Sequence, residues 1–171
     1  GMQYTYSMNH LIFMPAELTV GSEYSFDKLH DEILGYNRIT DQKINIGSAF
    51  LQNEWKNERV SILLGGRFDK HSLIKNSILS PRLNLRYNFN EVIGVRASYS
   101  SGFRAPQVYD EDLHGSAIGG EIAFVQNNTN LKPERSQSYS GSIDINKTFG
   151  SVQTELLIEG FYTNLDNVFF L

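Results

Sequence analysis

The run Asp110-Glu111-Asp112-Leu113-His114 is the densest group of chemically capable side chains in the sequence. Carboxylates and an imidazole on one loop are ligand types that a divalent cation accepts. The run nevertheless lacks the glycine and the later glutamate of a calcium-binding loop, which makes a solvated acidic loop the better interpretation. We therefore expect no resident metal or cofactor.

The other residues that could do chemistry are dispersed along the chain. His10, His30 and His71 each stand beside polar residues, and the absence of cysteine excludes thiolate catalysis, thiolate metal sites and disulfides. No nucleophile–base pair or paired-carboxylate site emerges, and Gly119-Gly120 lies in a long loop where flexibility explains it. We expect that the chain is not an enzyme. The net charge of -4 predicts no nucleic-acid partner.

Alternation of apolar and polar residues is the strongest structural signal. In residues 82–89 the leucines and aromatic residues fall on one face and the arginines and asparagines on the other, as in a strand. Residues 43–55 place Ile44, Ile46 and Phe50 on one side, although Leu51 and Trp55 blur the pattern. The same alternation predicts seven strands of roughly ten residues, at 17–26, 43–55, 59–69, 82–89, 91–101, 137–147 and 152–163.

The connections between these strands alternate in length. Residues 56–58, 88–91 and 149–151 read as tight turns with Asn or Gly, whereas 27–42, 70–80 and 102–136 are long. Transmembrane barrels show this asymmetry, and a tilted strand of about ten residues can cross a bilayer. The pattern favours an all-β, antiparallel up-and-down meander of about seven strands, part of a large transmembrane β-barrel.

Two other folds stay open at this point, because alternation does not tell the inside of a sheet from its outside. A soluble β-sandwich binding module would carry the same polar face toward water. A complete small barrel acting as an adhesin is disfavoured by the odd strand count. Aromatic residues near the strand ends favour the membrane barrel, where they would form girdles.

Two segments about thirty residues apart resemble motifs of TonB-dependent outer-membrane receptors. The first follows a strand and consists of Gly102, Phe103, Arg104, Ala105 and Pro106; the second consists of Asn130, Leu131, Lys132, Pro133, Glu134, Arg135 and Ser136 and begins the next strand. Neither proline can donate to a strand ladder, so the two segments bracket the long loop. Gly102 permits the turn out of the strand.

The resemblance implies a barrel of about twenty-two strands filled by a plug domain, in the cell outer membrane. The implied function is energy-coupled uptake of a bulky nutrient such as a siderophore, cobalamin or glycan. The implied partners are outer-membrane lipid, a TonB-type energy-coupling protein acting through the plug, and the nutrient on the outer loops, with loop 102–136 facing it. No ligand-binding residues are carried over.

We expect residues 1–171 to form a single partial barrel segment, with the plug and the remaining strands outside it. Gly1-Met2 reads as a cloning remnant, and no signal peptide precedes the first strand. An isolated segment would leave an apolar face and two strand edges open. We expect it to cover that face, either by curling the apolar side inward or by pairing with other copies.

Overall fold

The computed structural model describes residues 1–34, 38–106, 116–118, 121–123 and 132–168. Within these ranges no helix is long and apolar enough to cross a membrane. Eight strands form one antiparallel sheet in the order β1-β2-β3-β4-β5-β6-β9-β10, and β7 pairs with β8 separately. Their bounds are β1 Met2–Leu11, β2 Met14–Ile33, β3 Arg38–Lys56, β4 Val60–His71, β5 Ile78–Asn88, β6 Ile93–Arg104, β7 Ser116–Ile118, β8 Glu121–Ala123, β9 Glu134–Phe149 and β10 Val152–Asp166.

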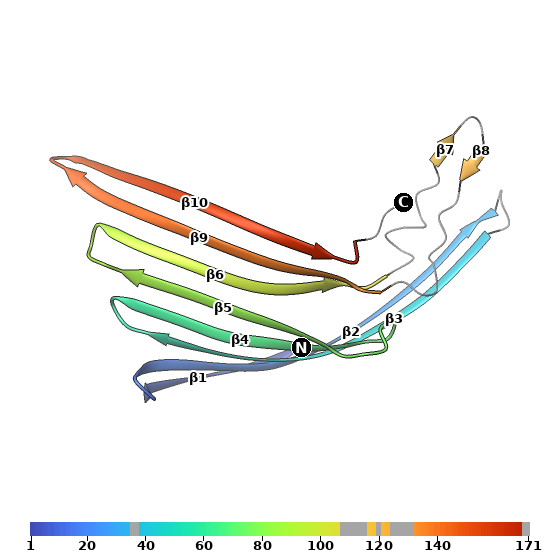
Figure 1. Cartoon of the computed structure of the whole chain (residues 1–171). Helices are drawn as coiled ribbons and strands as arrows, with labels where there is room; N and C mark the ends of the chain where they lie inside the picture. Colours follow the sequence, from blue (N-terminus) through green and yellow to red (C-terminus); the bar gives the residue numbers. More distant parts are fainter. Residues whose placement is uncertain (35–37, 107–115, 119–120, 124–131, 169–171) are drawn as a thin grey trace.

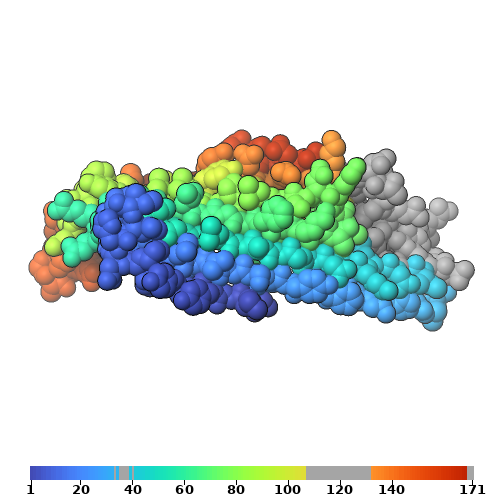
Figure 2. Space-filling view, turned by 90° about the horizontal axis from the view of Figure 1, so that it is seen from below, coloured from blue at the N-terminus to red at the C-terminus, as the bar shows by residue number. Residues whose placement is uncertain are grey.

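The large sheet is one curved layer in which the strands follow one another in chain order, with β9 pairing directly with β6 (Figure 1). Figure 2 shows the strands side by side across one face, from the blue N-terminal strand upward. The predicted all-β antiparallel meander is confirmed. The sheet has eight strands rather than about seven, since β1 was not anticipated.

The β1–β2 connection explains why β1 was missed. It contains no glycine or asparagine, and Ile12 adopts a φ of 64° there. Isoleucine in the left-handed region is strained, because its branched Cβ crowds the backbone. The usual signs of a tight turn are therefore missing from the sequence at this point.

Replacing Ile12 with asparagine should stabilise the barrel. Asparagine tolerates a positive φ, so Ile12→Asn should raise the free energy of unfolding of the full-length protein by about 1 kcal/mol. Urea titration of the folded barrel measures the change. Ile12→Val keeps the branched Cβ and should give no gain; equal stabilisation by both variants would contradict the strain.

The expected long link at 27–42 is largely strand, so that part of the prediction is wrong. Asp27 to Ile33 of β2 pairs with Arg38 to Ile44 of β3. Pairing between β3 and β4 starts only at Ile46 and His71, so residues 26–33 and 38–45 continue beyond β4 as a two-stranded β2–β3 ribbon (Figure 1). Eight residues per strand correspond to roughly 26 Å. Alternation is weak there because, apart from Ile44 at its base, most of the ribbon's described side chains are exposed or half-buried.

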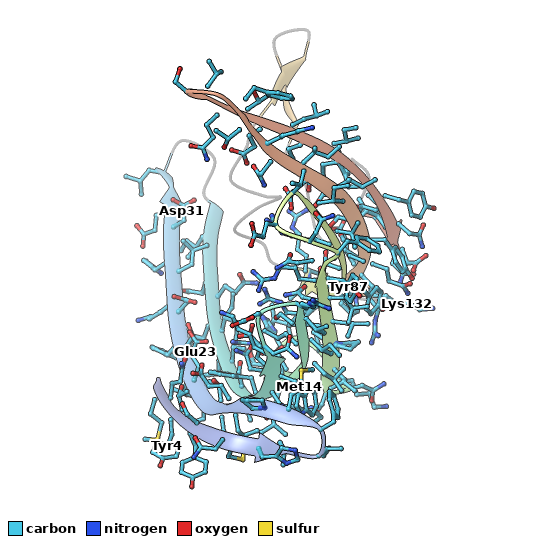
Figure 3. All side chains as sticks on the ribbon, turned by 90° about the vertical axis from the view of Figure 1, so that its left-hand side faces the viewer. Tyr4, Met14, Glu23, Asp31, Tyr87 and Lys132 are labelled. Carbon is cyan, nitrogen blue, oxygen red and sulfur yellow. The ribbon has the colours of Figure 1, made fainter. Side chains whose placement is uncertain are left out.

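The two faces of the sheet are distinguished by burial. Asp69 and Ser48 of the polar face are only 3% and 8% exposed, whereas Leu64 and Phe68 of the apolar face are 54% and 52% exposed. Side chains converge on the concave side of a curved sheet and diverge on its convex side. The polar face is therefore concave and the apolar face convex; in Figure 3 the side chain of Tyr4 points away from the rest of the sheet.

This arrangement corrects two expectations. The apolar side does not curl inward, since its large side chains are the exposed ones; pairing between copies stays a prediction. Ile44, Ile46 and Phe50 do share a face, but it is the concave one, and Leu51 and Trp55 belong to the convex face. Phe50 fits among polar neighbours because its ring occupies the space beside Gly21, where a side chain would collide with it.

Candidate functional site at the outer rim

The two motif segments meet at the end of the sheet away from the short turns, here called the outer rim. In the register between β6 and β9, Gly102 lies opposite Ser136 and Arg104 opposite Glu134. The Nη1 atom of Arg104 lies 3.5 Å from Oε2 of Glu134. A Cβ on Gly102 would lie 3.0 Å from the Oγ atom of Ser136, so this position favours glycine for reasons of space.

Ala105 anchors the base of the loop that leaves β6. It is 4% exposed and forms a small apolar cluster with Ile74 and Ile78, against which Phe103 packs. Ile74 belongs to the connection between β4 and β5, so the cluster joins that connection to the end of β6. The rim end of β6 is thereby fixed from two sides.

The rest of the two segments is only partly described. Pro106 follows β6, and Lys132 and Pro133 directly precede β9. Asn130 and Leu131 lie outside the described residues, as do the acidic run 110–114 and the pair Gly119-Gly120. In the described part of the chain, no group of three or more His, Asp or Glu residues is arranged to hold a metal ion.

A polar network joins three strands on the concave face below the rim. Arg67 donates from Nε to Oδ1 of Asp69 at 2.9 Å and from Nη2 to Oε2 of Glu23 at 3.0 Å. The same Nη2 lies 2.8 Å from Oγ of Ser48, which donates to Oδ1 of Asp69 at 2.5 Å. Glu23 stands far from Arg67 and Asp69 in the sequence, and the strand register brings them together on one face.

A second group of polar residues lines the concave face across β5, β6 and β9. Arg96 forms an ion pair with Asp144 at 3.0 Å, and the hydroxyls of Ser98 and Ser140 lie 2.7 Å apart. Arg96, Ser98 and Ser140, together with Asn84, line a hollow of about 300 Å³. The concave wall therefore offers charged and hydroxyl groups to whatever lies inside the curve.

The β2–β3 ribbon carries a histidine held by two carboxylates. Nδ1 of His30 lies 2.7 Å from Oδ1 of Asp41, and Nε2 lies 3.0 Å from Oε1 of Glu32. The hydrogen bond with Asp41, and then that with Glu32, raises the pKa of His30 above its ordinary 6.5. The hydrogen bond from His30 lowers the pKa of Asp41 below its ordinary 3.8. The carboxylates bind opposite nitrogens, so the three groups do not converge on one point.

These shifts predict a pH window for the ribbon. The raised pKa of His30 stabilises the folded ribbon fully at pH values below about 6.5. This stabilisation is lost as the pH rises through the raised pKa. The lowered pKa of Asp41 stabilises the folded ribbon fully at pH values above about 3.8, and this stabilisation is lost as the pH falls through the lowered pKa.

Asp41→Asn should bring the pKa of His30 closer to 6.5, as NMR titration of its imidazole would measure. Asp31→Asn, on the same ribbon but not bonded to the ring, should have less effect; equal shifts would contradict the pairing.

The features now described define a class of protein. One antiparallel sheet has a polar concave face, an apolar convex face, and tight turns at one end, which is the wall of a transmembrane β-barrel. Residues 2–171 match the family model described as TonB dependent receptor-like, beta-barrel. The chain belongs to this family.

Similar proteins agree with this membership. The "Probable TonB-dependent siderophore receptor PirA" of Acinetobacter baumannii is 25% identical over 161 residues, which cover 79% of this chain and 21% of that protein. The "Iron-regulated outer membrane virulence protein" of Vibrio cholerae is 30% identical over 111 residues, covering 64% of this chain and 16% of that protein. The chain thus spans about a fifth of the length of the curated relatives it matches.

Solved structures share the fold. The siderophore receptor PirA from Pseudomonas aeruginosa matches with a TM-score of 0.77 at 20% identity, over 95% of this chain and 31% of that one. A mutant of the ferric enterobactin receptor PfeA from the same organism, in complex with enterobactin, matches with a TM-score of 0.69 at 22% identity, over 91% of this chain and 25% of that one.

The family settles several expectations. Membership among TonB-dependent receptors and location in the outer membrane are confirmed. The family consists of receptors rather than enzymes. The soluble sandwich is wrong: a sandwich hides its apolar faces between two sheets, whereas here the large apolar side chains of a single curved sheet are exposed.

Proposed function

We propose that this chain supplies part of the barrel wall and one outer loop to a receptor that takes up an iron siderophore across the outer membrane. One observation carries the loop assignment. The strand register brings Arg104 and Glu134 together at the outer rim, so the intervening residues leave and re-enter the wall at one place. The names of the relatives favour a siderophore over a cobalamin or a glycan as the ligand.

The concave wall is proposed to face a plug domain in the full-length receptor. Arg67, Arg96 and their partners are polar groups suited to a protein or water-filled interior, not to lipid. The free edges of β1 and β10 are proposed to pair with further strands of a larger barrel, because an unpaired edge exposes backbone donors and acceptors. Movement of the plug by a TonB-type energy-coupling protein would then open a path for the ligand.

Deleting residues 107–130 from the full-length receptor tests the loop assignment. The deletion should abolish binding of the ferric siderophore while the barrel still folds, because it leaves β6, β9 and the Ala105 cluster intact. Binding is measured by quenching of intrinsic fluorescence, and folding by the heat-dependent shift in electrophoretic mobility.

A linker control separates loop chemistry from loop closure. Replacing residues 107–130 with a Gly-Ser sequence of the same length should lose binding as completely as the deletion does. Binding that survives both changes would contradict the assignment of this loop to ligand capture.

A further inference from the structure

Asn53 is an amide on the apolar, convex face of the sheet. Its direct cross-strand partners are Leu18 of β2 and Leu64 of β4, and its neighbours on the same face of β3 are Leu51 and Trp55. The residue is 8% exposed, and neither its amide oxygen nor its amide nitrogen has a hydrogen-bond partner among the described residues. It is therefore a buried polar group in apolar surroundings.

Such a group is costly where the convex face meets lipid. Water can satisfy a polar group on a soluble protein, but the hydrocarbon of a bilayer offers no donor or acceptor. A polar side chain at such a place needs a partner, and polar residues inside membranes often mark functional positions. The acceptors that a bilayer does provide are the ester carbonyls at the boundary of its hydrocarbon core.

Asn53 and Trp55 line one end of a hollow in the convex face. It has a volume of about 680 Å³, and Asn53 lines it together with Val20, Ala49, Gly66 and Leu79. Ala49 and Gly66 leave room where larger side chains would stand. A Cβ placed on Gly66 would still lie 3.7 Å from Cδ1 of Leu79, which is ordinary contact, so the hollow can accept additional atoms.

The position of Asn53 along β3 matches the depth of lipid esters. β3 ends at Lys56 beside a short turn, and Trp55 stacks on Phe13 with ring centroids 5.6 Å apart. Aromatic residues of this kind mark the membrane interface. From Trp55 to Ala49 the strand rises roughly 20 Å, and half of a bilayer's hydrocarbon core measures about 15 Å. For a tilted strand the hollow has about the length of one acyl chain.

We propose that this hollow binds one acyl chain of a glycerophospholipid, whose ester carbonyl accepts a hydrogen bond from the Asn53 amide. Short turns face the periplasm, so the lipid that meets this end of the wall belongs to the periplasmic leaflet. Asn53 lines the hollow, and its amide nitrogen has no hydrogen-bond partner among the described residues. The proposal rests on the lipid-facing convex surface and is independent of the siderophore.

An ester-to-ether comparison in the full-length receptor tests the proposal. Native mass spectrometry of the purified receptor measures retention of phosphatidylethanolamine and of its dialkyl-ether analogue with the same chain lengths. The ether lipid lacks the carbonyl acceptor, so the ester lipid should be retained about fivefold better, as the loss of one hydrogen bond implies. Asn53→Leu should remove this preference while chain binding persists.

Two further variants separate the chain from the amide. Gly66→Leu fills the hollow and should lower retention of both lipids, whereas Ala97→Leu, on the convex face of β6 outside the hollow, should leave both unchanged. Siderophore binding should stay constant in all variants, which keeps this test separate from the loop assignment.

Several outcomes would overturn the lipid site. They are equal retention of the two lipids by the unmodified receptor, a preference that survives Asn53→Leu, or unchanged retention in Gly66→Leu. Cross-links between two receptors at residues of the hollow would also contradict the lipid site, because they would show that a second receptor occupies the hollow instead of a lipid. If Asn53→Leu does not fold, the unmodified receptor and Gly66→Leu still decide the question.

Discussion

Leu64→Arg should destabilise the full-length barrel in a bilayer by about 2–4 kcal/mol, whereas Leu63→Arg should cost less than about 1 kcal/mol. Leu64 lies on the convex face and is 54% exposed, so an arginine there enters lipid. Leu63 is half-buried on the concave face directly opposite Glu54, which can pair with the new guanidinium. In a soluble protein the order would be reversed, because the more exposed leucine would tolerate the charge better.

The comparison needs both variants in the same lipid vesicles. Urea unfolding, followed by the fraction of protein with folded electrophoretic mobility, gives the two free energies of unfolding. The two leucines are adjacent on one strand and differ in the face they occupy, so strand propensity cancels. A larger loss for Leu63→Arg than for Leu64→Arg would contradict the assignment of the faces.

Arg67→Ala should lower the free energy of unfolding by about 2 kcal/mol. It removes the ion-pair partner of Asp69, whose side chain is 4% exposed, and leaves that carboxylate with the Ser48 hydroxyl as its one partner among the described residues. Loss of one partner from a buried pair costs about 3–5 kcal/mol, and the 40% exposure of Arg67 reduces the effect here.

Arg82 provides the control for this prediction. It lies on the concave face of the next strand, opposite Gly65, and forms no ion pair with the described residues. Arg82→Ala should change stability by less than about 0.5 kcal/mol. Arg67→Lys keeps the positive charge but loses the planar guanidinium that donates to two partners at once. Its loss of unfolding free energy should therefore lie between those of Arg67→Ala and Arg82→Ala. Equal losses for Arg67→Ala and Arg82→Ala would show that the network with Glu23 and Asp69 does not stabilise the wall.

The sequence predicts the strands of the wall well and the ends of the sheet poorly. Residues 82–89 alternate strictly because one face contacts lipid and the other faces the interior, and β5 follows that pattern. In the β2–β3 ribbon the described side chains beyond Ile44 are mostly exposed, so its pairing leaves little apolar alternation to detect. β1 does alternate, with Met2, Tyr4 and Tyr6 on the convex face, but its turn at Ile12 carries no turn residue.

The sequence alone does not identify the interior face of the sheet. Alternation with a period of two separates two faces but does not tell which of them lies inside the barrel. Curvature and burial supply the answer. The order and spacing of the two motif segments were visible in the sequence, but the pairing of Gly102 with Ser136 depends on strand register. Asn53 was also missed: a single amide in an irregular stretch becomes notable only when its neighbours across the strands prove to be Leu18 and Leu64.

Site-directed spin labelling along β5 tests most directly the central claim, that the polar face lines the interior and the apolar face meets lipid. The chain has no cysteine, so single cysteines can be introduced in the full-length receptor and labelled in vesicles. Labels at Leu79, Leu83, Leu85 and Tyr87 should be accessible to oxygen dissolved in lipid; labels at Ser80, Arg82, Asn84 and Arg86 should favour a water-soluble relaxation reagent. Uniform accessibility along the strand, or the opposite alternation, would contradict the barrel wall described above.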